Sequence, residues 1–281
     1  MANNALNLNN LRLAVLIDAE NVPRNCIKSV MEEIAIYGTP TIKRIYGDWT
    51  NPTISGWKTS LLENAITPIQ QYSYTIGKNS SDSAMIIDAM DILYSEKTDG
   101  FVIVSSDSDF TRLAIRLREA GQRVIGIGER KTPNAFIAAC DKFTYIEVIR
   151  AAAEEARQEQ DEARSEHEET QQENSDNDHK QNQQPRDKHT SAPRPRGTKV
   201  PKSVVHLIAD SLADLAGDDG VVFMGELGNL ILKKQPDFDH RNFGYKSLSA
   251  MIKAIDRFET DFRQTADPNI KHVFVRDKEA T

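Results

Sequence analysis

Short apolar runs alternate with amphipathic stretches over the first 150 residues of the chain. The apolar runs predict strands at residues 11–17, 41–47, 69–75, 100–106, 123–128 and 144–149. The stretches between them, such as 83–96 and 110–121, repeat apolar residues at helical spacing, and Gly121 is suited to end the second of them. Strands and helices that alternate in this way predict an α/β fold of the Rossmann-like type, with a parallel sheet between helices.

A long polar stretch follows this pattern. Residues 156–197 contain no large apolar side chain and are rich in Glu, Gln, Asp and Asn, with Pro near the end. Such a segment cannot bury enough surface to offset the entropy of ordering it, which predicts a disordered linker. Its first turns, 151–160, could instead extend the preceding helix. The chain therefore divides into a first domain at 1–150, a linker at 151–198 and a second domain at 199–281.

The apolar pattern returns after the linker in a different form. Residues 201–216, 224–234 and 245–255 predict three short helices. Residues 258–264 and 272–277 then predict two strands around a polar turn at 266–269. Three helices followed by a hairpin form the winged-helix pattern, so we expect a small α+β domain at the C-terminal end.

Composition narrows the class of protein. Cys26 and Cys140 are the only cysteines, and neither belongs to a CxxC or a Cys/His cluster. This excludes a zinc ribbon and a disulfide framework and suits a reducing compartment. The first ten residues lack the basic and apolar regions of a secretory signal, and no apolar run approaches membrane-spanning length. We therefore expect a soluble, cytoplasmic protein with no membrane partner.

The net charge of −7 argues at first sight against nucleic-acid binding. Most of the acidic excess lies in the linker, however, and the two flanking domains are each close to neutral. Affinity for a polyanion would have to come from local patches of Lys and Arg, because bulk charge does not supply it.

Acidic side chains follow two of the predicted strands and open one predicted helix. The first strand runs into Asp18-Ala19-Glu20-Asn21, the fourth runs into Ser105-Ser106-Asp107-Ser108-Asp109, and Asp82 follows a Gly-Lys-Asn-Ser-Ser loop. Ligands of open parallel sheets gather at the carboxyl ends of the strands. We therefore expect Asp18, Asp82, Asp107 and Asp109 to meet at one edge of the sheet.

A hard divalent cation best explains converging carboxylates, which otherwise repel one another. Mg²⁺ or Mn²⁺ takes oxygen ligands, keeps several waters and commonly binds substrate phosphate. The sequence thus predicts metal-dependent phosphodiester hydrolysis, with the four acids as metal ligands and catalytic groups. No P-loop, Ser-His-Asp arrangement or reactive cysteine competes for the site, and all six histidines fall in or after the linker.

The surrounding polar residues have more than one interpretation. The candidates for supporting roles are Glu20, Asn21, Lys78, Asp88, Ser105 and Ser106. Glu20 could bind the cation or orient another ligand, and Asn21 could cap a helix or orient a water. Lys78 could touch phosphate or lie exposed in its loop. Asp88, inside a predicted helix, could support the site from behind or belong to a solvated face.

Three motifs carry a family resemblance. LAVLIDAEN, GKNSSDSAMIIDAMDIL and IVSSDSDFTRLAIRLREAGQRVIGIG resemble the NYN domain, LabA-like branch, of the PIN-like nuclease superfamily. The resemblance covers about residues 10–150 and places the family's acids and Asn on Asp18, Asn21, Asp82 and the S-x-D-x-D-F element at 105–110. It implies a PIN-like fold and divalent-metal-dependent ribonuclease activity, and it allows two copies to pair through this domain.

A fourth motif, DFDHRNFGYKSLSAMI, resembles the LOTUS (OST-HTH) domain together with the elements around it, over about residues 200–278. That resemblance implies binding of RNA, G-rich or structured, or docking to a protein. The residues themselves suggest a basic and partly aromatic face formed by Lys233, Lys234, Arg241, Tyr245, Lys246 and Lys253. The same lysines could instead be scattered and solvated. Phe238, Phe243, Leu248 and Ile252 are expected in the core.

The leading hypothesis is an RNA endonuclease whose second domain holds the substrate through a flexible tether. The alternative is a non-catalytic RNA-binding regulator that keeps the nuclease fold, although retention of all four acids favours the enzyme. A phosphatase of the haloacid-dehalogenase type would need an Asp where Glu20 stands. A nicotinamide-binding domain would need a GxGxxG after the first strand, and GIGE at 126–129 is late and short.

Overall fold

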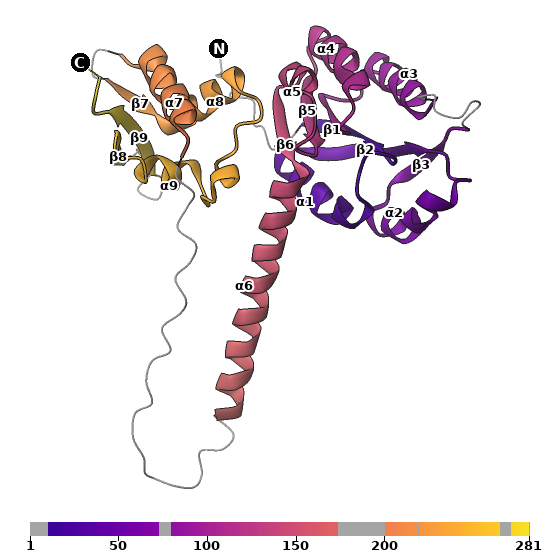
Figure 1. Ribbon diagram of the computed structural model, residues 1–281, viewed down its shortest axis with the longest axis horizontal. Coiled ribbons are helices and arrows are strands. Elements are labelled where there is room, and N and C mark those ends of the chain that lie inside the picture. The colour runs from indigo at the N-terminus through magenta and orange to yellow at the C-terminus, as the bar shows by residue number, and fades with distance from the viewer. Residues whose placement is uncertain (1–10, 73–79, 174–199, 218–219, 265–270, 281) are drawn as a thin grey trace.

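A computed structural model of the chain describes residues 11–72, 80–173, 200–217, 220–264 and 271–280. The first domain is a six-stranded sheet between two layers of helices, and the second carries helices on a small sheet (Figure 1). Every strand pair of the six-stranded sheet is parallel, and both pairs of the smaller sheet are antiparallel. This confirms the expected α/β fold with a small C-terminal domain.

The six-stranded sheet has the order β3-β2-β1-β4-β5-β6. Its strands are β1 (Arg12–Asp18), β2 (Thr39–Gly47), β3 (Thr67–Gln70), β4 (Gly100–Val104), β5 (Arg123–Gly128) and β6 (Lys142–Tyr145). The strand order reverses between β1 and β4. In such sheets the loops that follow the two central strands turn to opposite faces and leave a crevice at the carboxyl edge.

Two apolar layers explain the sandwich. In β1, Leu13, Val15 and Ile17 pack into one layer, while Ala14 and Leu16 pack into the other, as the two-residue period of a strand requires. The first layer is covered by α1 (Ile27–Tyr37), α2 (Lys58–Asn64) and the start of α6 (Ile146–Glu173). The second layer is covered by α3 (Ser80–Tyr94), α4 (Thr111–Glu119) and α5 (Asn134–Ala139).

The end of the first domain differs from the sequence prediction. The strand expected at 144–149 ends at Tyr145, and α6 begins at Ile146. The predicted strand is wrong from Ile146 on, because Ile146 and Ile149 lie one helical turn apart and are both buried. The strand predicted at 69–75 is observed as β3, which ends at Gln70, so the prediction is wrong at 71–72; residues 73–75 lie outside the described residues.

Helix α6 also continues to Glu173, well past position 156, where the linker was expected to begin. Ala, Glu, Gln and Arg dominate this stretch, and these are good helix formers even where no apolar face is buried. Absence of apolar residues predicted a segment without a core, but it did not exclude a helix. The remainder of the expected linker, 174–199, lies outside the described residues.

The second domain packs three helices on a small antiparallel sheet with the order β7-β9-β8 in its described residues. Its elements are α7 (Lys202–Leu215), β7 (Val221–Phe223), α8 (Met224–Lys234), α9 (Leu248–Lys253), β8 (Phe258–Gln264) and β9 (Lys271–Asp277). Strand β7 was not expected, since three residues are too few to show a period. As predicted, Phe238 and Ile252 are buried in the core, while Phe243 and Leu248 pack against it.

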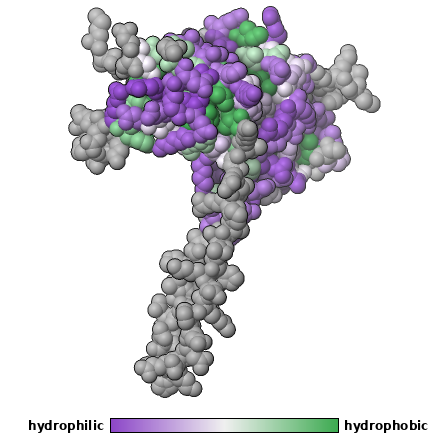
Figure 2. Space-filling model, turned by 60° about the vertical axis from the view of Figure 1, so that its left-hand side comes forward, coloured by the Kyte–Doolittle hydropathy of each residue, from purple (hydrophilic) through white to green (hydrophobic). Residues whose placement is uncertain are grey.

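The two domains touch at the outer strand of the large sheet. The small domain lies beside β6 (Figure 1), and the Phe143 amide donates a hydrogen bond of 2.8 Å to the Pro236 carbonyl. The surface seen in Figure 2 is mostly hydrophilic, with apolar residues confined to small patches. Among the described helices, none is long and apolar enough to cross a membrane.

Candidate functional site

The candidate site begins where β1 and β4 end side by side. Ile17 pairs with Val104, so the next residues, Asp18 and Ser105, leave the sheet as neighbours. The Ser105 hydroxyl donates a 2.9 Å hydrogen bond to the Asp18 carboxylate, and both side chains are buried. Adjacent parallel strands thus bring together two residues that are 87 positions apart in the sequence.

Asp18 is held by three donors. Besides Ser105, its carboxylate accepts hydrogen bonds from the Glu20 amide at 3.0 Å and from the Asn21 side chain at 2.7 Å. A buried carboxylate needs such partners, because an unpaired charge away from water is costly. The Asp18-to-Asn21 turn therefore has one fixed shape, with Asn21 orienting Asp18 and not capping the helix that follows.

The loop after β4 is fixed by the same serine. The Asp107 amide donates to the Ser105 hydroxyl at 3.1 Å, and the Asp107 carboxylate accepts from the Asp109 amide at 2.9 Å. Asp107 is the N-cap of the short 3-10 helix Ser108–Phe110, which leads into α4. Asp107 therefore caps this helix through one carboxylate oxygen.

Asp82 completes a cluster of three carboxylates. It lies in the first turn of α3 and is buried, and one oxygen each of Asp82, Asp107 and Asp109 lies within 4.8 Å of the others. Burial, together with repulsion from Asp18, Asp107 and Asp109, raises the pKa of Asp82 to about 7. The field at this point is therefore strongly negative.

The donor set of this cluster fits a hard divalent cation. All three groups are carboxylates, and spacing within 4.8 Å lets one ion touch an oxygen of each. Asp107 is half-buried and Asp109 is exposed, so one side of the cluster stays open to water or to a phosphate. Asp18 lies outside this group of three, and its charge acts from the adjacent position.

The other candidates occupy different places. Ser106 accepts a 2.8 Å hydrogen bond from the Glu129 amide and so ties the β4 loop to the end of β5. Glu20 is exposed at the rim, and its charge adds to the raised pKa of Asp82. Asp88 sits farther along α3, where it accepts hydrogen bonds from Arg44 and Tyr46. Lys78 lies outside the described residues.

Sequence reasoning missed Arg44 and Tyr46. Both come from β2, and their side chains converge on the Asp88 carboxylate of α3. Tyr46 is almost fully buried, and burial together with Asp88 raises the pKa of its hydroxyl far above the ordinary range. The signal in the sequence was a pair of charged residues, Lys43 and Arg44, inside a predicted strand.

Most of the six residues of the second domain that were expected to bind RNA make other interactions. Lys234 pairs with Asp214 at 2.6 Å, Lys246 pairs with Glu159 of α6 at 2.7 Å, Lys253 lies over the Phe262 ring, and Arg241 contacts Glu33 and Asp239. Tyr245 packs against the domain core, and Lys233 is exposed. A role for these residues toward RNA remains a prediction.

Comparison with known families agrees with this architecture. The sequence matches the NYN domain family over residues 12–147 and the OST-HTH/LOTUS domain family over residues 198–270. The chain joins an NYN domain to an OST-HTH/LOTUS domain. Both resemblances drawn from the motifs are thereby confirmed, and the acidic cluster lies within the NYN domain, a member of a nuclease superfamily.

Two solved structures are similar to parts of the chain. One is a protein of unknown function from Vibrio parahaemolyticus, with 19% identity and a TM-score of 0.42, covering 49% of this chain and 94% of that one. The other is an uncharacterized protein from Nitrosomonas europaea, with 30% identity and a TM-score of 0.28, covering 36% of this chain and 95% of that one. Comparison with curated proteins found no match.

Proposed function

We propose that this NYN–LOTUS chain is a divalent-metal-dependent endoribonuclease that hydrolyses RNA phosphodiester bonds. The observation that carries the proposal is the meeting of Asp82, Asp107 and Asp109 within 4.8 Å at the carboxyl edge of the sheet. Two separate segments of the chain supply these three carboxylates. One of them, Asp82, is buried, and its pKa is strongly raised. Sites that perform chemistry tolerate such unfavourable placement, whereas purely structural positions seldom do.

Asp82, Asp107 and Asp109 would hold Mg²⁺ or Mn²⁺, with Asp18 adding charge from the adjacent position. When bound, such a cation supplies Lewis-acid stabilisation of the phosphate and a water of lowered pKa as nucleophile. The protein's own residues position and orient these carboxylates. Ser105 aligns Asp18 with the Asp107 loop, and Asn21 holds the Asp18 carboxylate in place. The exposed side, at Asp109, is where the RNA backbone would approach.

The second domain is proposed to bind the RNA substrate. Its family is one of RNA-binding modules, and this chain joins it to a nuclease-type domain. A second contact on the same molecule raises the effective concentration of substrate at the acidic cluster without adding contacts there. G-rich or structured RNA is the expected ligand class, and pairing of two chains through the NYN domain also belongs to this proposal.

The first experiment compares the wild-type protein with Asp82→Asn and with Asp91→Asn, an exposed carboxylate on the same helix. Labelled RNA is incubated with each protein in Mn²⁺, in Mg²⁺ and in EDTA. We expect metal-dependent cleavage by wild type and Asp91→Asn, and a loss of at least about 100-fold in Asp82→Asn, since a preorganised charge in the site is removed.

Metal binding, RNA binding and cleavage are measured separately in the same samples. Thermal unfolding with and without Mn²⁺ reports metal binding, and a gel shift reports RNA binding. A metal-induced rise in Tm that Asp82→Asn abolishes, without any cleavage by wild type, would identify a retained metal site in a non-catalytic RNA-binding protein. Equal cleavage by all three proteins would place the chemistry elsewhere.

A further inference from the structure

The outer strand of the nuclease-type sheet is covered by a segment of the other domain. Among the residues that the structure describes, β6 pairs with β5 alone, and its other side meets the second domain through the hydrogen bond from the Phe143 amide to the Pro236 carbonyl. The neighbouring Tyr145 hydroxyl donates to the Asp237 carboxylate at 2.7 Å. Open edges of sheets tend to pair with foreign chains, so proteins usually protect them.

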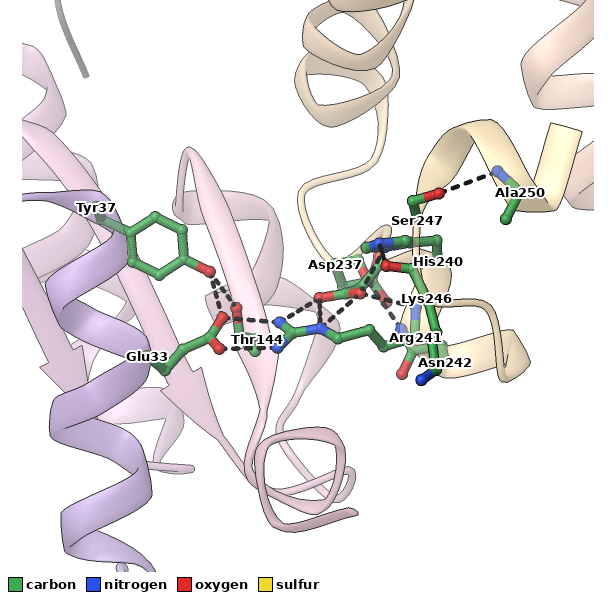
Figure 3. Close-up of polar contacts among 11 residues, drawn as sticks. Glu33, Tyr37, Thr144, Asp237, His240, Arg241, Asn242, Lys246, Ser247 and Ala250 are labelled. Carbon is green, nitrogen blue, oxygen red and sulfur yellow. Dashed lines mark hydrogen bonds and ion pairs between the residues drawn. The ribbon is translucent and has the colours of Figure 1, made fainter. Parts of the chain in front are cut away.

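A second set of contacts joins the domains beside this edge. The Arg241 guanidinium donates two parallel hydrogen bonds, of 2.8 Å and 2.7 Å, to the two oxygens of Glu33 on α1 (Figure 3). Its other N–H groups bind Asp239 of its own domain. A planar guanidinium that grips a carboxylate with two bonds fixes direction as well as distance.

The burial of Glu33 depends on this contact. The Glu33 side chain is 5% exposed, and its carboxylate is satisfied by Tyr37 of the same helix and by Arg241 of the other domain. Glutamate is rarely buried without a charged partner. The partner here comes from a segment 208 positions away, so α1 carries a residue suited to a covered surface.

Charge is balanced across the interface. Two carboxylates, Glu33 and Asp239, face the Arg241 guanidinium and the half-buried Lys142 of β6. Buried ion pairs of this kind add little net affinity because desolvation offsets attraction, but breaking one is costly. They therefore favour one orientation of the two domains over others.

We infer that residues 235–246 are a docking segment that seats on the β6 edge and on Glu33 of the same chain, so that the two domains move as one body. The occupant of the β6 edge is thus the chain's own second domain. Arg241 is the docking residue, and RNA contacts of the second domain come from surfaces that this segment leaves open.

The test measures how the domains tumble in the full-length protein. ¹⁵N relaxation is recorded for wild type, for Glu33→Arg, which sets two cations against each other, and for Asp214→Arg. Asp214 forms an exposed ion pair with Lys234 inside the second domain, so its charge reversal serves as the matched control away from the interface. We expect a single rotational correlation time in wild type and Asp214→Arg, and two shorter, unequal times in Glu33→Arg.

The outcomes are distinct. Independent tumbling of the domains in wild type, or unchanged tumbling in Glu33→Arg, would overturn the inference. Sedimentation adds a third reading: a wild-type dimer that Glu33→Arg converts to monomers would mean that the contact joins two copies. Circular dichroism checks folding, and Arg241→Glu repeats the test from the other domain if Glu33→Arg does not fold. None of these readouts uses RNA, so they are independent of the proposed nuclease activity.

Discussion

Ser105 is the residue on which the geometry of the acidic site depends most. Its hydroxyl donates to Asp18 and accepts from the Asp107 amide, so one side chain sets the spacing between the ends of β1 and β4. Ser106, the next residue, makes a comparable bond to the Glu129 amide but touches no member of the cluster. Replacing each serine in turn therefore separates an effect on the geometry of the site from an effect on stability.

We predict that Ser105→Ala lowers the metal-dependent cleavage rate by about 10- to 100-fold, because misplacement of a positioning contact by a fraction of an ångström is enough for such a loss. Ser106→Ala should lose about 1 kcal/mol of stability, as expected for one hydrogen bond, and keep most of its activity. Cleavage rates and denaturant midpoints for the two variants check this. Equal loss of activity in both would mean that loop stability alone matters.

At the scale of elements, α3 must hold Asp82 against two loops that come from other strands. The carboxylate of Asp88, further along the same helix, binds both Arg44 and Tyr46 of β2. A hydrogen bond to a charged group contributes about 1.5–3 kcal/mol. These contacts lock the helix to the sheet and so fix where its first turn lies.

We predict that Tyr46→Phe lowers cleavage several-fold and increases amide hydrogen exchange along α3, since the helix loses one of its two ties to β2. Tyr94→Phe is the matched control, because Tyr94 is exposed at the other end of the same helix. Hydrogen exchange read by mass spectrometry distinguishes the variants. Unchanged exchange in Tyr46→Phe would show that packing alone holds the helix.

At the scale of the whole molecule, the docking segment couples the two domains through a carboxylate that titrates. Burial raises the pKa of Glu33, but the hydrogen bonds and charge of Arg241 outweigh burial, and the net shift is downward from 4.5. A lowered pKa means that the docked state is favoured above pH 4.5 and loses this contribution as the pH falls further. Asp239 keeps Arg241 as a partner within its own domain, so Glu33 is the group that senses docking.

We predict one cooperative unfolding transition near pH 7, which separates into two as acid protonates Glu33 below its lowered pKa. Calorimetry from neutral to acid pH measures the change. The Glu33→Gln variant should show two transitions at every pH, because its side chain carries no charge. A single transition in Glu33→Gln near pH 7 would contradict this account.

Much of the fold and part of the site followed from the sequence. Short apolar runs predicted four of the six strands of the large sheet nearly in place, and three of these, β1, β4 and β5, are buried on both faces and leave an unbroken apolar signal. The runs at 69–75 and 144–149 overlap β3 and β6 by two residues each. Asp18, Asp82, Asp107 and Asp109 were expected together; the last three meet within 4.8 Å, and Asp18 lies outside that group. The switch from strand to helix at Ile146 was missed, since a short apolar run fits both periods.

What the sequence determined by itself is what depends on near neighbours: the periods that make strands and helices, the acids that follow strand ends, and the motifs of the two domains. The tertiary structure decided what depends on distant partners. Asp88 looked like a helix-face residue until β2 brought Arg44 to it. Arg241 looked like an RNA contact until the second domain docked and Glu33, 208 positions away, took its guanidinium. Neither ion pair leaves a local pattern in the sequence, because its two residues attract each other only after folding has brought their segments together.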